Sequence, residues 1–486
     1  MNPIQVALPD GIHPYWPSLL RRIGIPAGRI GHSPCAILFL PDDTGVGDAD
    51  LRSRVADLRE QGAPVLAGIA WGEALGARLR GRDLVGFSQR SIEGIRRIDP
   101  SPLLALPFPE ASRLLKVSSS FATFTGPNGS AAEEVVARAD HGGLRRAVED
   151  ALRGLSFAAG RPFARLSPLP YGKDGGLAIR VDADGYRESS TRAVLASLAA
   201  SGLRATWFVD VERHEANGGM EDVRRIAALG HDVQTHLWRH YTYRSEEQNR
   251  RSLARSLEVL ARAGIRATAA AAPFGTWNRG FAAALRREGI QWSSEFARVH
   301  DDVPSCLGGE PGEPWQVPVH PICPALLLAR GHTPDDVAAW WSRVFSRCLA
   351  RREPAVFYGH PVGGLDRCPG LLPAIARTAR GLCRDLWQPT LSELFAFFRA
   401  RAEQSPRVSM DGNCLIGCCD GPAPLIVELP SSAPLVLRGE FAVVPRGCAD
   451  LRAPLRPAVY EPLRRGNARW RAARLRARRM LAEIRR

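Results

Sequence analysis

Two aspartates that stand two residues apart are the first feature of the chain that could do chemistry. They lie in the segment Arg-Val-Asp-Ala-Asp-Gly at 180–185, at the end of an apolar run that is typical of a strand. Alternate side chains on a strand point to the same face, so the carboxylates of Asp182 and Asp184 would face one side. Aspartate and glycine are also common turn residues, and D-x-D-G taken alone is better explained as a strand-to-turn signal.

A pair of histidines follows a later predicted strand at 232–235. His236 and His240 are four residues apart, and on a helical turn this spacing projects both imidazoles from one side. Two neutral imidazoles and one carboxylate form a common ligand set for catalytic zinc, with the fourth position left for water. An H-x-x-x-H spacing alone is more often a coincidence than a metal site, but the D-x-D motif at another strand end favours metal binding. We therefore predict a divalent metal, Zn²⁺, on Asp184, His236 and His240.

A third strand end carries Tyr-Gly-His-Pro at 358–361. The imidazole of His360 has an ordinary pKa near 6.5, which suits a general acid at neutral pH. The alternative is a partly buried histidine that bonds to a turn carbonyl.

The elements that would position these groups form a regular pattern. Apolar or β-branched runs occur at 177–182, 205–210, 232–235, 267–273, 291–296, 315–319 and 355–359, and amphipathic helical patterns occupy most of the intervals. Strand then helix, repeated about seven times, predicts a parallel sheet closed into a distorted (β/α) barrel over 175–404. In such barrels the chemistry lies at the carboxyl ends of the strands.

The rest of the chain divides by composition. Residues 1–150 alternate apolar runs with helical stretches, which predicts an α/β domain of unassigned role, and 151–174 is expected as a linker. Short apolar runs at 405–460 predict a small β-rich appendage, and 461–486 is an arginine-rich amphipathic helix. That helix could lie on an anionic membrane surface, or be a solvated basic helix or one that binds nucleic acid.

Charge and cysteine usage limit the class of protein. The formal net charge is +15, yet Lys116 and Lys173 are the only lysines, so much of the charge reflects arginine usage, and nucleic acid is not the expected partner. No secretion signal and no apolar run of membrane-spanning length is visible, which favours a cytoplasmic protein, peripheral to the inner membrane if the basic helix binds there. The cysteines at 414, 418, 419 and 448 lack paired C-x-x-C spacing, so a structural zinc site is not expected.

The order of these motifs resembles the polysaccharide deacetylase family (NodB homology domain, carbohydrate esterase 4-like) over roughly residues 175 to 400. The resemblance implies that Asp182 is the catalytic base, that Asp184, His236 and His240 hold the metal, and that His360 is the acid. The family's usual first motif has adjacent aspartates, whereas Ala183 separates them here. This D-x-D form resembles the branch that deformylates or deacetylates lipid-linked sugars.

The segment 271–277, Ala-Ala-Pro-Phe-Gly-Thr-Trp, is similar to the family's R-x-P-Y-G motif, but Ala271 stands where an arginine normally orients the base. Either Arg180 or Arg279 replaces that arginine, or the activity is weakened. The resemblance implies that the Phe274 backbone N–H helps to hold the oxyanion. It assigns the substrate-side or acid-tuning positions to Pro273, Trp277, Glu295 and Asp302.

These expectations describe a hydrolase of non-peptide carbon–nitrogen bonds, which removes an acetyl or formyl group from an N-acylated sugar or a lipid-linked sugar in surface-glycan assembly. Two alternatives remain open at this point. One is a non-catalytic carbohydrate-binding relative, which the missing motif arginine would explain, and the other is a hydrolase of a cyclic or non-sugar amide.

Overall fold

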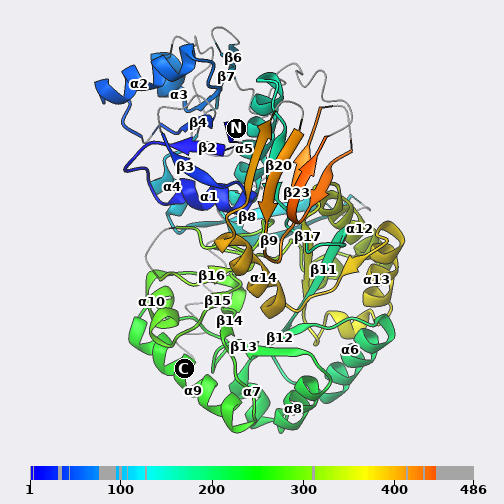
Figure 1. Cartoon of the computed structure of the whole chain (residues 1–486). Helices are drawn as coiled ribbons and strands as arrows, with labels where there is room; N and C mark the ends of the chain where they lie inside the picture. Colours follow the sequence, from blue (N-terminus) through cyan, green and yellow to red (C-terminus); the bar gives the residue numbers. More distant parts are fainter. Residues whose placement is uncertain are drawn as a thin grey trace.

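The computed structural model describes residues 2–3, 5–30, 36–42, 44–75, 95–97, 101–106, 108–125, 129–308, 312–411, 414–430 and 433–444. The predicted basic helix 461–486 and Cys448 lie outside these residues. A curled sheet ringed by helices forms one end of the molecule, and a smaller sheet and a group of late strands form the other (Figure 1).

The curled sheet is the predicted barrel. Its seven main strands run in the order β16-β15-β14-β13-β12-β11-β17, all neighbouring pairs are parallel, and β18 pairs with the start of β11. The sheet curls without closing, since β16 and β17 are its two ends, and the predicted fold class is confirmed. The bounds are β11 (Gly175–Ala183), β12 (Thr206–Val209), β13 (Asp232–Thr235), β14 (Ala269–Ala270), β15 (Trp292–Ser293), β16 (Trp315–Gln316), β17 (Pro354–Gly359) and β18 (Leu386–Trp387).

Helices cover the outer face of this sheet (Figure 1). The caps that start them are local: Ser245 accepts from the Gln248 N–H at the start of α9, and Thr333 and Asp336 form a capping box at the start of α12. The helices are α6 (Glu188–Ser201), α7 (Val211–Ala216), α8 (Met220–Ala228), α9 (Glu246–Arg262), α10 (Arg279–Arg287), α11 (Pro324–Leu328), α12 (Pro334–Ala350), α13 (Leu371–Leu382) and α14 (Leu391–Glu403).

A second sheet lies in the first part of the chain, with strand order β3-β2-β4-β5-β7-β6. Its core gathers large aromatic side chains, among them Trp16, Phe39 and Trp71, all fully buried. The strands are β2 (Gln5–Leu8), β3 (Ala27–Arg29), β4 (Ala36–Leu40), β5 (Val65–Ala67), β6 (Ile95–Arg97) and β7 (Leu103–Ala105). The helices are α1 (Tyr15–Ile23), α2 (Ala49–Glu60), α3 (Ile69–Ala74), α4 (Ala111–Leu115) and α5 (His141–Ala158).

The late strands pair with early ones. β10 (Phe163–Leu166) pairs with β21 (Leu425–Glu428), which pairs with β22 (Leu435–Leu437). β1 (Asn2–Pro3) pairs with β19 (Arg407–Asp411), followed in the same sheet by β20 (Cys414–Cys419) and β23 (Gly439–Val443). The expected linker 151–174 therefore contains the end of α5 and a buried strand rather than a free connector. The exact domain limits stay a prediction.

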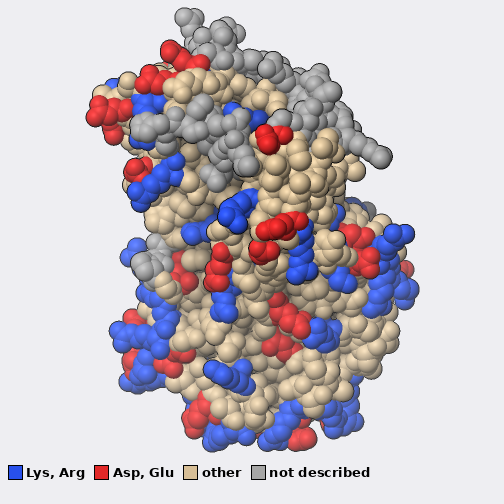
Figure 2. Space-filling view, in the orientation of Figure 1, with Lys and Arg blue, Asp and Glu red and all other residues tan. Residues whose placement is uncertain are grey.

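Buried arginine–carboxylate pairs join the first part of the chain to the barrel. Arg22 of α1 and Arg145 of α5 both bind Asp302, at 2.9 and 2.6 Å, and Arg145 also binds Glu353 at 2.7 Å. On the visible surface, by contrast, basic and acidic side chains of the described residues are interspersed (Figure 2). Exposed ion pairs within helices, such as Arg251–Glu247, are among the described contacts. None of the described helices is long and apolar enough to cross a membrane.

Candidate metal centre and pocket

Asp184 stands between two histidines at the carboxyl ends of β11 and β13. Its Oδ1 lies 3.1 Å from His236 Nε2 and its Oδ2 lies 3.1 Å from His240 Nε2. One ligand atom from each residue lies within 4.8 Å of the other two, and no other such group occurs among the described residues. Burial acts to raise the pKa of Asp184, but the two imidazoles hold it well below its usual range. The carboxylate is therefore ionised, as a metal ligand must be.

The segment that carries the histidines is a loop and not the helical turn expected from their spacing. Residues 236–240 follow β13 without helical structure, and Leu237 has φ 71, a left-handed conformation that a helix does not contain. The Thr235 hydroxyl accepts from the Leu237 N–H at 2.9 Å, and the His236 N–H donates to the Val209 carbonyl at 2.8 Å. These bonds bend the chain so that both imidazoles reach Asp184.

Arg180 holds Asp182 in place. Its Nε donates to Asp182 Oδ1 at 2.6 Å and its Nη2 donates to Oδ2 at 2.8 Å, a bidentate pair within one strand. A further donor, Nη1, reaches Ser294, and the guanidinium is fully buried over the Phe208 ring. Arg279, the other candidate substitute for the missing motif arginine, is exposed at the start of α10. Arg180, and not Arg279, therefore holds the carboxylate of Asp182.

His360 lies on the same side of Asp184 as the pocket. Its Nε2 is 3.4 Å from Asp184 Oδ2 and its Nδ1 is 3.2 Å from the sulfur of Cys323. Burial acts to lower the pKa of His360, but Cys323 and Asp184 together raise it to about 10. In this arrangement the imidazole carries a proton that it can donate.

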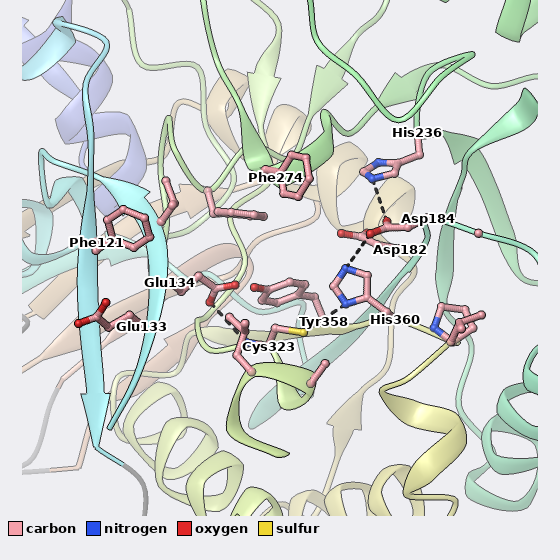
Figure 3. A pocket seen from close by; sticks show the side chains of 17 residues that line it. Phe121, Glu133, Glu134, Asp182, Asp184, His236, Phe274, Cys323, Tyr358 and His360 are labelled. Carbon is pink, nitrogen blue, oxygen red and sulfur yellow. Dashed lines mark hydrogen bonds and ion pairs between the residues drawn. The ribbon is translucent and has the colours of Figure 1, made fainter. Parts of the chain in front are cut away.

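A pocket of about 420 Å³ opens between these groups and a β-hairpin. Figure 3 shows Asp184, His236 and His360 at one end, with Phe274 and Tyr358 on either side and Phe121 and Glu134 at the other end. Phe274, in the turn at Pro273–Gly275, is 50% exposed with φ 58, and its ring packs edge-on against His240. Strained backbone of this kind is characteristic of functional sites.

A sequence comparison identifies the family of this region. Residues 174–293 match the profile described as polysaccharide deacetylase. The chain contains a polysaccharide deacetylase domain. The predicted family is thereby confirmed, and so is the predicted enzyme class, because these deacetylases are hydrolases of carbon–nitrogen bonds other than peptide bonds.

Solved structures of the same kind resemble about half of the chain. A polysaccharide deacetylase from Mycobacterium smegmatis is 20% identical over 51% of this chain and 99% of its own, with a TM-score of 0.41. A family 4 carbohydrate esterase from Streptomyces lividans, in complex with acetate, is 18% identical over 45% and 93%, with a TM-score of 0.33. A CE4-family pseudoenzyme from Bacillus anthracis is 13% identical over 45% and 64%, with a TM-score of 0.33. No curated protein matches the chain.

Four residues expected on the substrate side of the deacetylase site do not line its pocket. Asp302 is buried against Arg22 and Arg145. The Glu295 carboxylate accepts from the Ala272 N–H at 2.8 Å, and burial raises its pKa well above its usual range. Pro273 is buried within its turn, and Trp277 packs edge-on against Phe281.

Other pocket residues were not predictable from motifs. Phe121 and Glu134 come from the hairpin of β8 (Ser119–Thr125) and β9 (Ala131–Ala137), far from the deacetylase motifs in the sequence. Cys323, the partner of His360, is a single cysteine before α11. Neither a lone cysteine nor a glutamate in a strand has a spacing that indicates chemistry.

Proposed function

We propose that the protein is a divalent-metal-dependent deacylase that removes an N-acetyl or N-formyl group from a sugar or a lipid-linked sugar during surface-glycan assembly. One observation carries the proposal: a three-residue metal-ligand set, an arginine-held carboxylate and a histidine meet at one pocket of the sheet that contains the polysaccharide deacetylase match at 174–293. A protein that only bound carbohydrate would have no need of all three. A cytoplasmic location fits a precursor substrate and stays part of the proposal.

The donor set fits a zinc ion. Asp184, His236 and His240 would provide one oxygen and two nitrogens, leaving a position open for water. Asp184 Oδ1 and His240 Nε2 are buried and make no hydrogen bond, although each lies within contact distance of its neighbour. Buried polar atoms rarely remain unsatisfied, and an ion shared between them would satisfy both. A divalent ion there would polarise the amide carbonyl and lower the pKa of an attacking water.

The remaining steps belong to side chains of the pocket. Asp182, fixed by Arg180, would take the proton from the attacking water. The backbone N–H of Phe274, whose residue lines the pocket, would donate to the developing oxyanion. His360, which lines the pocket beside Asp184, would give a proton to the departing amine.

Removal of a ligand tests the proposal. His236→Ala and His240→Ala are expected to lose bound metal, measured by elemental mass spectrometry, together with release of acetate or formate from N-acylated amino sugars. His231→Gln is the matched control, because His231 precedes β13 and contacts the Ala205 N–H from outside the triad. Full turnover in metal-replete His236→Ala protein would show the ligand assignment to be wrong. Hydrolysis of a cyclic amide in place of N-acyl sugars would reject the substrate class.

A further inference from the structure

The hairpin of β8 and β9 forms one wall of the deacetylase pocket although it precedes the family match at 174–293. It is fixed to the barrel at several points. The Ala137 N–H donates to the Phe296 carbonyl at 2.7 Å, and Phe124 packs edge-on against Trp340 of α12. The wall is therefore a built part of the pocket.

The barrel-facing side of the hairpin contains one acidic residue among apolar ones. Alternation along β9 places Ala132, Glu134 and Val136 on one face, and all three are buried. Ala132 and Val136 pack in the barrel core, and Ala122, which pairs with Glu134 across the strands, packs there too. A buried glutamate in such a position is costly unless it has a partner.

The partners that the structure gives Glu134 are few. Its Oε2 accepts from the Cys323 N–H at 3.3 Å. Within the described residues, no lysine, arginine or histidine forms an ion pair with it. Burial raises the pKa of Glu134 to about 8, so at neutral pH its carboxyl is largely protonated and can both donate and accept a hydrogen bond. The side chain points into the pocket, towards the space in front of Asp184 and His360 (Figure 3).

The pocket itself shows what such a group could bind. Its lining contains aromatic and aliphatic side chains such as Phe121, Phe274 and Leu326, and among the described residues it includes no lysine or arginine. Apolar walls with a few placed polar groups fit the flat faces and hydroxyls of an uncharged sugar. Apart from His236 and His360 beside Asp184, an anionic group inside the pocket would meet no basic side chain among these lining residues.

We infer that Glu134 is a specificity-determining residue that hydrogen-bonds a ring hydroxyl of an uncharged N-acylated amino sugar held between the hairpin and the metal centre. The inference rests on the proposed function for the reaction, and it adds the residue and the substrate group that select the sugar. A hydroxyl requires no charge from its partner, so glutamine can replace glutamate there, whereas leucine cannot.

The test uses N-acetylglucosamine and its 3-deoxy, 4-deoxy and 6-deoxy analogues with the metal-loaded full chain. Glu134→Leu is expected to raise KM for the intact sugar about tenfold or more and to leave kcat within about twofold, as for a lost buried hydrogen bond. Glu134→Gln should restore KM to within about threefold of the parent. For one deoxy analogue, the KM of the parent should be raised as much as Glu134→Leu raises the KM for the intact sugar. With that analogue, Glu134→Leu should cause no further rise in KM. Glu110→Leu, an exposed glutamate near the start of α4, is the control.

Each other outcome has a definite meaning. An unchanged KM in Glu134→Leu, with hydrolysis intact, overturns the inference and leaves the proposed function standing. Equal loss in the Leu and Gln variants overturns the hydroxyl assignment in favour of a cationic group. A fall in Tm with unchanged KM assigns Glu134 a structural role. If the parent hydrolyses none of these sugars, binding of N-acetylglucosamine is measured by calorimetry. Binding that depends on Glu134 would support the inference and contradict the proposed function. The absence of binding would contradict both.

Discussion

At the scale of single residues, Asp182, the proposed base, is oriented by an arginine of its own strand. Arg180 and Asp182 stand two residues apart on β11, so both face the barrel interior and their bidentate bond forms without help from another element. Ala271, where the family has its arginine, is buried beside this interior. Arg180 of β11 therefore holds Asp182, although position 271 is an alanine.

Arg180→Lys tests this arrangement. Lysine keeps the positive charge but lacks the planar fork that holds both oxygens of Asp182, so kcat should fall about 10- to 100-fold with metal content unchanged. The readouts are steady-state kinetics and metal analysis on the same preparations. Arg279→Lys, at the exposed alternative position, should retain full activity. Similar losses in both variants, or none in Arg180→Lys, would contradict the assignment.

The residues of the candidate metal centre are predictable from the sequence because their positions follow from general geometry. Alternation on β11 and the shared carboxyl edge of parallel strands bring Asp182 and Asp184 to the loop that carries His236 and His240. Glu134 and Cys323 are not predictable in this way, because they meet the site only through long-range packing of a hairpin and a helix end. Local patterns contain no information about such contacts.

At the scale of elements, Asp302 shows how a position in the sequence can mislead. The resemblance to the deacetylase family implies a substrate-side or acid-tuning role, but α1 and α5 direct Arg22 and Arg145 onto its carboxylate. The two arginines lower the pKa of Asp302 more than burial raises it. The residue therefore joins the first part of the chain to the barrel.

Asp302→Ala should accordingly destabilise the fold and leave the catalytic site intact. Two buried guanidinium groups would lose their shared partner, which typically costs about 3–5 kcal/mol in the free energy of unfolding. Urea denaturation measures that loss, and KM of the folded variant should match the parent. Asp335→Ala, exposed in the first turn of α12, should change stability by no more than about 0.5 kcal/mol. An altered KM with normal stability would contradict this prediction and assign Asp302 a role at the substrate.

At the scale of the whole molecule, strands from the early part of the chain pair with strands from its late part. β1 pairs with β19 and β10 pairs with β21, so strands from the two parts lie side by side above the barrel (Figure 1). The barrel also contains buried histidines, and burial lowers the pKa of His214 and of His320 to about 4. The stability of the fold is thereby linked to pH.

The sign of that link follows from His320. In the unfolded chain its pKa would be near the ordinary 6.5, so between about pH 6.5 and 4 the unfolded state binds a proton that the folded state does not. The free energy of unfolding therefore falls as the pH falls.

In the variant His320→Asn, the side-chain amide could still accept from the Val356 N–H, which donates to His320 Nδ1 at 3.0 Å, but it cannot titrate. Between pH 7 and 5, His320→Asn should therefore lose about 2 kcal/mol less stability than the parent, measured by urea denaturation. His13→Asn, at a partly exposed histidine, should follow the parent. Parallel pH curves for the parent and His320→Asn would mean that His320 is protonated in the folded protein. That result would contradict the assignment of His320 as a buried neutral histidine.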